Sequence, residues 1–289
     1  MKMNSSFAKW FYLLALSLIW GSSFILIKKG LTGFGYFEAA TIRLVSAGLV
    51  FLPFGLLNFS KIPRDKMVFV GLAALLGMVL PAYFFCLAQQ HVQSSVAGIL
   101  NALTPVFTFV FAILLFRTSY KTKQVAGLLL GLICAVLLAM DDPATTIRFN
   151  LYAGLIVLAT AFYGLNINLI KNRLAEIPAI ALSTVAVSVA GLLAFLLVML
   201  PNLEKYTVAE HQWTPLLALL ALGVFGTALA QLLHYQLISQ SSALFASSPT
   251  YIIPIVAVCW GLLDGEPFHL LHALSVAGIL AAVVMIRKG

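Results

Sequence analysis

Ten long apolar runs, separated by short polar links, occupy this chain of 289 residues almost from end to end. A helix that crosses a bilayer needs about 20 mostly apolar residues. Charged residues make up only 9% of the chain, whereas a soluble domain usually carries about 25%, so a water-facing surface cannot be covered. We therefore expect an all-α membrane protein with ten transmembrane helices. The runs lie near residues 10–27, 36–57, 67–88, 94–116, 122–140, 151–170, 179–200, 215–238, 243–263 and 270–286.

The basic residues are distributed unevenly between the links. If the N-terminus is cytoplasmic, the inner segments hold twelve Lys and Arg residues and the outer segments hold four, while Arg43 lies within the second run. The positive-inside rule then places both termini in the cytoplasm of a multi-pass protein of the inner membrane. Lys28 and Lys29 fall on the outer side, against the rule. The same bias accounts for the formal net charge of +8 without a nucleic-acid partner.

The two halves of the sequence resemble each other. At a shift of 143 residues, Trp20-Gly21 meets Tyr163-Gly164, and Lys28 meets Lys171. Five spans in each half is an odd number, so we expect residues 1–145 and 146–289 to form two inverted five-helix repeats. Inverted repeats are typical of secondary transporters, in which they support alternating access. Gene duplication also builds channels and inert scaffolds, and these alternatives stay open.

Several motifs resemble those of EamA-type transporters in the drug/metabolite transporter superfamily. The segment Trp20-Gly21-Ser22-Ser23-Phe24, with Lys28 after it, is similar to the opening motif of that family. Arg43, the proline-containing segments 94–105 and 241–254, and Asp264-Gly265-Glu266 also match its pattern. The first half departs from it at Leu115-Phe116-Arg117, and the sixth run has Tyr163 in place of a second Trp. The resemblance covers essentially the whole chain and implies transport of small metabolites, often amino acids.

Polar side chains in the middle of the runs are the candidates for a substrate pathway. Such groups are costly at membrane depth unless they are paired or face water, although they also bond neighbouring helices together. Arg43 could hold the substrate or play a structural role, and the sequence leaves both open. His234 is the deepest group that titrates near neutrality, but we expect it close to the inner end of its run. The predicted pathway residues are Trp20, Ser23, Arg43, Asn101, Thr104, Tyr163, Asn166, Gln231 and Tyr251.

Prolines and glycines suggest which runs are central. Proline within a helix removes a backbone donor and leaves a carbonyl without its partner, which is tolerated at membrane depth only beside protein or water. Pro81, Pro105, Pro249 and Pro254 therefore predict that the third, fourth and ninth runs are central. The fifth and tenth runs should be peripheral and should pack on each other through small faces such as Gly127 with Gly131.

No pattern in the sequence predicts an enzyme, a cofactor or a metal site. All nine acidic residues fall in links or at the ends of runs, and no nucleophile–base pair or phosphate-binding glycine loop occurs. Cys86, Cys134 and Cys259 lie in apolar runs without ligand spacing, so we interpret them as small buried apolar residues. Because no carboxylate lies at mid-run, we expect gradient-driven transport without obligatory proton coupling.

The favoured hypothesis is a secondary transporter, an exporter of small metabolites such as amino acids. Its partners would be the small-molecule substrate and the lipid bilayer, while the oligomeric state stays open. An alternative is transport of nucleotide sugars or sugar phosphates, which would need several basic groups near the midplane. A pore or an intramembrane enzyme ranks lower, because rings of repeated polar residues and a catalytic pair are both missing from the sequence.

The charge distribution generates a topology prediction. Green fluorescent protein fused after Gly289 should fluoresce, and alkaline phosphatase fused there should be inactive, because the C-terminus is expected in the cytoplasm. Truncation after Lys205, in a link expected outside, provides the control and should reverse both results. Active phosphatase at Gly289 would overturn the topology.

Overall fold

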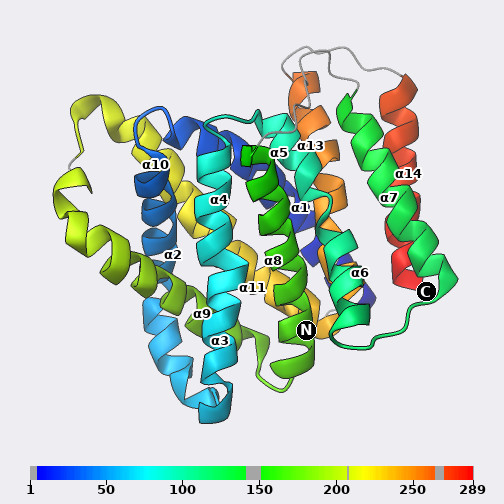
Figure 1. The fold of residues 1–289 in the computed structure, drawn as a ribbon, viewed down its shortest axis with the longest axis horizontal. Coiled ribbons are helices and arrows are strands. Elements are labelled where there is room, and N and C mark those ends of the chain that lie inside the picture. Colours follow the sequence, from blue (N-terminus) through cyan, green and yellow to red (C-terminus); the bar gives the residue numbers. More distant parts are fainter. Residues whose placement is uncertain (1–4, 141–150, 207, 264–269, 289) are drawn as a thin grey trace.

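The computed structural model describes residues 5–140, 151–206, 208–263 and 270–288. Over these ranges every regular element is a helix and no strand occurs, as the composition predicts (Figure 1). The expected boundary between the two halves, after residue 145, and the Asp264-Gly265-Glu266 motif lie outside the described residues.

Some spans are uninterrupted helices, and others contain π-helical or 3₁₀ segments. The elements in chain order are α1 (Ser5–Gly30), α2 (Tyr36–Asn58), η1 (Phe59–Lys61), η2 (Arg64–Lys66), α3 (Met67–Ala74), η3 (Leu75–Val79), α4 (Leu80–Ala88), α5 (Ser94–Asn101), α6 (Thr104–Leu114), α7 (Thr122–Met140), α8 (Leu151–Arg173), α9 (Ala179–Ala194), η4 (Phe195–Met199), η5 (Leu200–Tyr206), η6 (Glu210–Gln212), α10 (Trp213–Ala221), η7 (Leu222–Leu229), α11 (Ala230–Gln240), α12 (Ala243–Ser247), α13 (Pro249–Leu263) and α14 (Leu270–Lys288).

Eight helical stretches in the described part of the chain are long and apolar enough to cross a membrane. Two more apolar stretches, Thr122–Leu137 and Ala243–Val256, are shorter and coincide with the fifth and ninth predicted spans. The helix α7 as a whole has 19 residues, about 28 Å at 1.5 Å per residue, which is close to the roughly 30 Å of a hydrocarbon core. The count of ten spans stays a prediction.

The surface of the bundle is apolar and its interior is partly polar. Leu57, Leu114 and Leu197 are at least 70% exposed, which would be unfavourable in water but suits contact with lipid. By contrast, the Asn166 and Asn168 side chains are almost fully buried. Buried amides need hydrogen-bond partners or water, so the interior must either pair these groups or enclose a hydrated space.

Glycines allow two pairs of helices to approach closely. Where α2 crosses α9, a Cβ atom on Gly48 would lie 2.7 Å from the Gly191 Cα atom. On α7, a Cβ atom on Gly127 would lie 2.9 Å from the Ala282 carbonyl oxygen of α14. Figure 1 shows α7 and α14 side by side at one edge of the bundle. Small residues at these crossings let backbones touch, which is the usual basis of helix association in lipid.

Prolines coincide with breaks in three of the predicted spans. The fourth span, expected as one helix, divides after Asn101, and Pro105 lies in the first turn of α6. The ninth divides at Ser248, and Pro249 begins α13. In the third, Pro81 lies in the first turn of α4, directly after the π-helical η3. These breaks correct the expectation of continuous helices, because proline cannot donate to the preceding turn.

The beginning of α1 lies beside the end of α14. The Arg287 guanidinium carbon is 5.2 Å from the centre of the Trp10 ring, a cation–π contact. The first turns of the described chain and its last turn are therefore on the same side of the bundle.

The atoms nearest to Gly131 belong to the ninth span and not, as we had expected, to the tenth. A Cβ atom on Gly131 would lie 2.7 Å from Cε2 of Tyr251, on α13. Gly127, one turn earlier on the same face of α7, is nearest to α14. The small face of α7 therefore serves two neighbours.

Replacing Gly131 by leucine should reduce folded yield and thermal stability, because the new side chain meets the buried Tyr251 ring. Overpacking a filled interior typically costs about 1–3 kcal/mol. Gly154→Leu is the matched control, since a Cβ atom at Gly154 meets nothing within 4 Å. Yield and unfolding temperature can be measured by fluorescence-detected size-exclusion chromatography of heated samples. Normal yield together with an altered substrate range would instead place α7 on the pathway.

Candidate functional site

A cavity that combines a largely apolar wall with several polar groups lies at the centre of the bundle. Its lining comes from α1, α2, η3, α4, α5, α6, α8, η7, α11, α12 and α13. No lining residue belongs to α7, α9 or α14, in keeping with a peripheral position for the fifth and tenth spans. The cavity volume is about 70 Å³, which is room for roughly five water molecules.

Eight of the nine predicted pathway residues line this cavity. They come from α1, α2, α5, α6, α8 and α11, and they are Trp20, Ser23, Arg43, Asn101, Thr104, Tyr163, Asn166 and Gln231. The spacing of polar residues in the sequence thus predicted a shared space among helices that are far apart in the chain. Whether a substrate uses this space is a proposal that we take up below.

Tyr251 is the exception among the nine. Its side chain is fully buried, and its hydroxyl donates to the Leu128 carbonyl of α7 at 2.9 Å. The ring covers Gly131 on the same helix. Tyr251 therefore lies on the side of α13 that faces α7, while its neighbour Thr250 lines the cavity. We had expected Tyr251 to face the cavity, and in this structure it bonds α13 to α7 instead.

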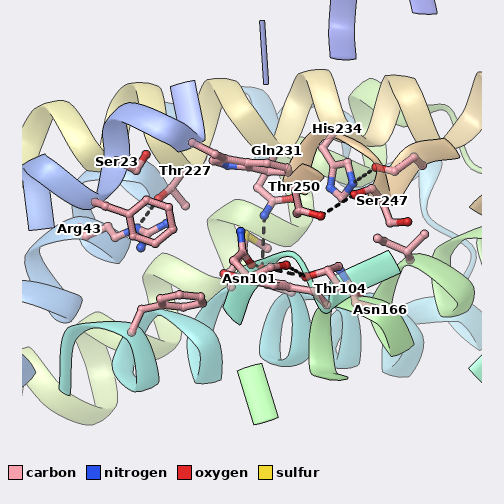
Figure 2. Close-up of a pocket in the computed structure, with 18 of the residues that line it drawn as sticks. Ser23, Arg43, Asn101, Thr104, Asn166, Thr227, Gln231, His234, Ser247 and Thr250 are labelled. Carbon is pink, nitrogen blue, oxygen red and sulfur yellow. Dashed lines mark hydrogen bonds between the residues drawn. The ribbon is translucent and has the colours of Figure 1, made fainter. Parts of the chain in front are cut away.

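Arg43 and Thr227 occupy one end of the cavity, and His234 and Ser247 the other (Figure 2). Arg43 Nε donates to Thr227 Oγ1 at 2.7 Å, so this bond fixes the plane of the guanidinium group. Among the described residues, Arg43 forms no ion pair. The ion pair that these residues do form joins Lys66 to Glu176, which lie outside the cavity lining. A positive charge at this depth is costly unless something compensates it.

Gln231 is oriented by a carbonyl group that a proline leaves available. Pro81 has no N–H with which to bond the Gly77 carbonyl, four residues earlier. That carbonyl accepts a hydrogen bond of 3.3 Å from Gln231 Nε2, on the facing helix. Because a carbonyl can only accept, this bond fixes which end of the amide is the donor. Gln231 Oε1 is then a buried acceptor with no protein partner.

Two asparagines contribute further polar groups to the lining. Asn101 accepts a bond from Thr104 through both its backbone carbonyl, at 2.9 Å, and its side chain, at 3.4 Å. The first of these serves the carbonyl that Pro105 cannot bond. Asn166 Oδ1, like Gln231 Oε1, is buried and accepts no hydrogen bond of good geometry, although the Tyr235 hydroxyl lies beside the Asn166 side chain. The cavity therefore contains two unpaired acceptors.

His234 lines the cavity although it lies near the end of its span, as expected. Only six residues of α11 follow it. Its Nε2 lies 3.2 Å from the Ala246 carbonyl. Since that carbonyl accepts, Nε2 carries the proton and Nδ1 of the neutral ring is an acceptor. Trp20 meets the ring edge-on, with centroids 5.0 Å apart.

Aromatic rings form much of the remaining wall. Phe24 packs against Phe85 with ring centroids 6.0 Å apart, and Phe85 stacks on Tyr163 at 6.2 Å. These residues all line the cavity together with Trp20. Their faces suit apolar groups and also cations, which are attracted to aromatic rings. The site therefore joins an apolar wall to a few oriented polar groups, the usual composition of a small-molecule site.

Sequence reasoning missed several lining residues. Thr227, His234 and Ser247 are polar residues of apolar runs, but polarity alone could not separate them from groups that only bond helices together. Gly77 and Phe85 gave no signal, because neither a glycine nor a phenylalanine is unusual in an apolar helix. No cluster of potential metal ligands occurs among the described residues, and no carboxylate lines the cavity. The free thiols of Cys86 and Cys134 are buried outside it.

Comparisons with known proteins agree on a transporter family. The sequence model of the EamA-like transporter family matches residues 9–140 and again residues 150–288. The uncharacterized inner membrane transporter YedA of Escherichia coli K12 is 29% identical over 96% of this chain and 90% of its own length. A chloroplastic WAT1-related protein of Arabidopsis thaliana is 25% identical over 98% of this chain and 70% of its own.

More distant relatives extend the comparison. The S-adenosylmethionine/S-adenosylhomocysteine transporter of Chlamydia trachomatis is 24% identical over 87% of this chain and 80% of its own length. A solved structure titled only as a crystal structure of a protein superposes with a TM-score of 0.74 at 16% identity. It covers 98% of this chain and 96% of its own. At that identity it supports the fold alone.

A cysteine placed in the cavity should be accessible to small reagents. In a background with Cys86, Cys134 and Cys259 replaced by alanine, Ser23→Cys should react with a methanethiosulfonate reagent. Ser183→Cys is the control, because Ser183 is fully buried on α9 and does not line the cavity. Reaction at the cavity should be at least roughly tenfold faster, since the control requires local opening. Equal rates, measured by mass spectrometry, would show that the cavity is closed to solutes.

Proposed function

The chain belongs to the EamA-like transporter family, and on this basis we propose that it is a secondary transporter of small metabolites such as amino acids. The proposal includes location in the inner membrane, both termini in the cytoplasm, and export by alternating access. It rests above all on the cavity, whose oriented polar groups converge at the centre of an apolar bundle. Five waters occupy about 150 Å³ of liquid, a volume comparable to that of a small metabolite.

The pairing of helices supports two inverted five-helix repeats, residues 1–145 and 146–289. The helix α1 packs on α13 and on α10 and α11, while α8, its counterpart in the second half, packs on α6 and on α4. The pairs α2 with α9 and α7 with α14 each join a helix to its own counterpart. Exchange of the halves thus maps each of these contacts onto another, as a pseudo-two-fold axis requires.

Two contacts between the halves, at opposite ends of α2, also support alternating access. At one end, Lys66 Nζ lies 3.1 Å from Glu176 Oε1. At the other, Gln212 Nε2 donates to the Gly33 carbonyl at 2.6 Å. Exchange of the halves relates the first pair of links to the second. Rocking of one repeat against the other would open one contact while keeping its counterpart closed.

The alternatives fit the cavity less well. Nucleotide sugars and sugar phosphates carry several negative charges, whereas Arg43 is the one lysine or arginine in the lining. An enzyme needs reacting groups within hydrogen-bond reach of each other. Among the described residues, His234 bonds the Ala246 carbonyl and meets the Trp20 ring, and neither is a catalytic partner. The relatives with assigned roles are transporters, consistent with a protein that is not an enzyme.

The direct test is flux through purified protein in proteoliposomes. Vesicles loaded with a pool of radiolabelled protein amino acids should release a subset of them with saturation kinetics, which a pore would not show. Trp20→Ala should lower saturable release roughly tenfold, equivalent to about 1.4 kcal/mol of lost binding. Protein-free vesicles provide the control. Release that is linear in concentration for every solute would exclude a carrier.

The same vesicles distinguish the mode of energy coupling. We expect release to follow the solute gradient and to be unchanged by an imposed pH gradient, since no carboxylate lines the cavity. His234 is the one lining group with an ordinary pKa near neutrality, so a proton-coupled mechanism would have to use it. Accumulation that depends on the pH gradient in the parent protein and disappears in His234→Gln would establish coupling.

A further inference from the structure

We propose that the cavity is a two-ended site for a zwitterion, with Arg43 binding a carboxylate and Gln231 and Asn166 binding an ammonium or another N–H donor. The inference rests on the proposed transport function and adds to it the chemistry of the substrate and the residues that select it. It comes from the hydrogen-bonding groups that the protein leaves unused around the cavity.

The first end presents a cation without a counter-ion. Arg43 Nε is used by Thr227, which leaves the four N–H groups on its two Nη atoms. No acidic residue lines the cavity. The guanidinium edge formed by the two Nη atoms matches the two oxygens of a carboxylate, and such paired bonds are the strongest that arginine makes. An anionic group of the substrate would supply the charge that the described residues do not.

The second end presents acceptors without donors. Gln231 Oε1 and Asn166 Oδ1 are both buried without partners, and the side chains are 7% and 2% exposed. The Gly77 carbonyl holds the Gln231 amide so that its oxygen, not its nitrogen, is available. A buried acceptor that stays unpaired costs about 1–3 kcal/mol. Both acceptors would be paired by a substrate that carries N–H groups.

The distance between the ends suits a single small zwitterion. Thr227, which orients Arg43, and Gln231 are four residues apart on one continuous helical span. At the α-helical rise of 1.5 Å per residue, four residues correspond to at most about 6 Å, because Thr227 lies in the tighter-pitched π-helical η7. A carboxylate and an ammonium attached to the same carbon, as in an α-amino acid, can then each reach one end. His234, one further turn along, offers Nδ1 as another acceptor on the same side.

The walls then determine what else the substrate carries. Trp20, Phe24 and Tyr163 place aromatic rings around the polar groups. They favour an uncharged side chain and also attract the ammonium group. A second negative charge would have no cation to meet in the lining, so dicarboxylates and phosphates should be rejected.

The test uses intact protein in nanodiscs and compares three forms of each solute. Probes are the protein amino acids with uncharged side chains, each with its deaminated acid and its decarboxylated amine. Binding is measured from the ligand-induced rise in unfolding temperature. At least one zwitterion should bind roughly tenfold or more tightly than both of its counterparts. If none does, the proposal is overturned.

Variants separate the two ends. Gln231→Leu should abolish the preference for the zwitterion over its deaminated acid, whereas Gln231→Glu should keep it. Both lose the amide bond to Gly77, so their difference isolates the acceptor from any effect on folding. Arg43→Gln should abolish the preference over the amine. Gln89→Leu is the control, since Gln89 is another buried amide without partners but lies outside the cavity lining.

The outcomes also separate this inference from the proposed function. Saturable flux of an acid, an amine or a neutral solute, with no zwitterion preferred, would support the transport function but overturn the two-ended site. Unchanged preferences in both Gln231→Leu and Asn166→Leu would overturn the assignment of the acceptor end. Absence of saturable flux for every solute tested would overturn the transport function on which the inference rests.

Discussion

Backbone carbonyl groups at membrane depth must find donors within the protein, and this constraint shapes the centre of the bundle. Prolines in three spans remove the donors that the preceding turns would use. Side chains supply replacements: Gln231 bonds the Gly77 carbonyl, and Thr104 bonds that of Asn101. Irregular backbone is tolerated in membranes only where protein or water serves it in this way. The broken helices therefore meet at the centre, away from lipid.

The same bonds position the groups that line the cavity. The bond from Gln231 to Gly77 selects the end of the amide that remains available, and the bond from Arg43 to Thr227 selects the edge of the guanidinium group. Each of these bonds joins the first half of the chain to the second, so a shift of one half against the other would change the presentation of the polar groups. Substrate recognition and the relative position of the halves are thereby linked, which is the coupling that alternating access needs.

The apolar runs predicted the helical class, and the polar residues within them predicted most of the cavity lining. An amide or arginine in an apolar run is costly when it faces lipid, so it is expected to face the interior. The direction of each side chain around its helix could not be predicted for residues that suit packing and binding equally. Tyr251 illustrates this. Its ring and hydroxyl suit a cavity, yet the ring packs against α7, where Gly131 has no side chain to exclude it. The depth of His234 near the end of its span was predictable, but whether its ring faces the cavity was not. The breaks after Asn101 and Ser247 coincide with prolines from which we had predicted only that these runs are central.

The two unpaired oxygens in the cavity, Gln231 Oε1 and Asn166 Oδ1, lower the stability of the fold. Two buried acceptors at about 1–3 kcal/mol each represent a large share of the 5–15 kcal/mol by which a typical soluble domain is stable. The Gln231 amide nitrogen stabilises the structure because it bonds the Gly77 carbonyl, but stability gives no reason for the two unpaired oxygens. Polar groups that weaken the resting structure and are oriented by further bonds are expected where a ligand completes them. Water can bond these groups when no substrate is bound, and the cavity has room for it. The free-energy cost of these unpaired groups is recovered when a ligand bonds them. This favours a ligand that offers donors at one end and an anion at the other.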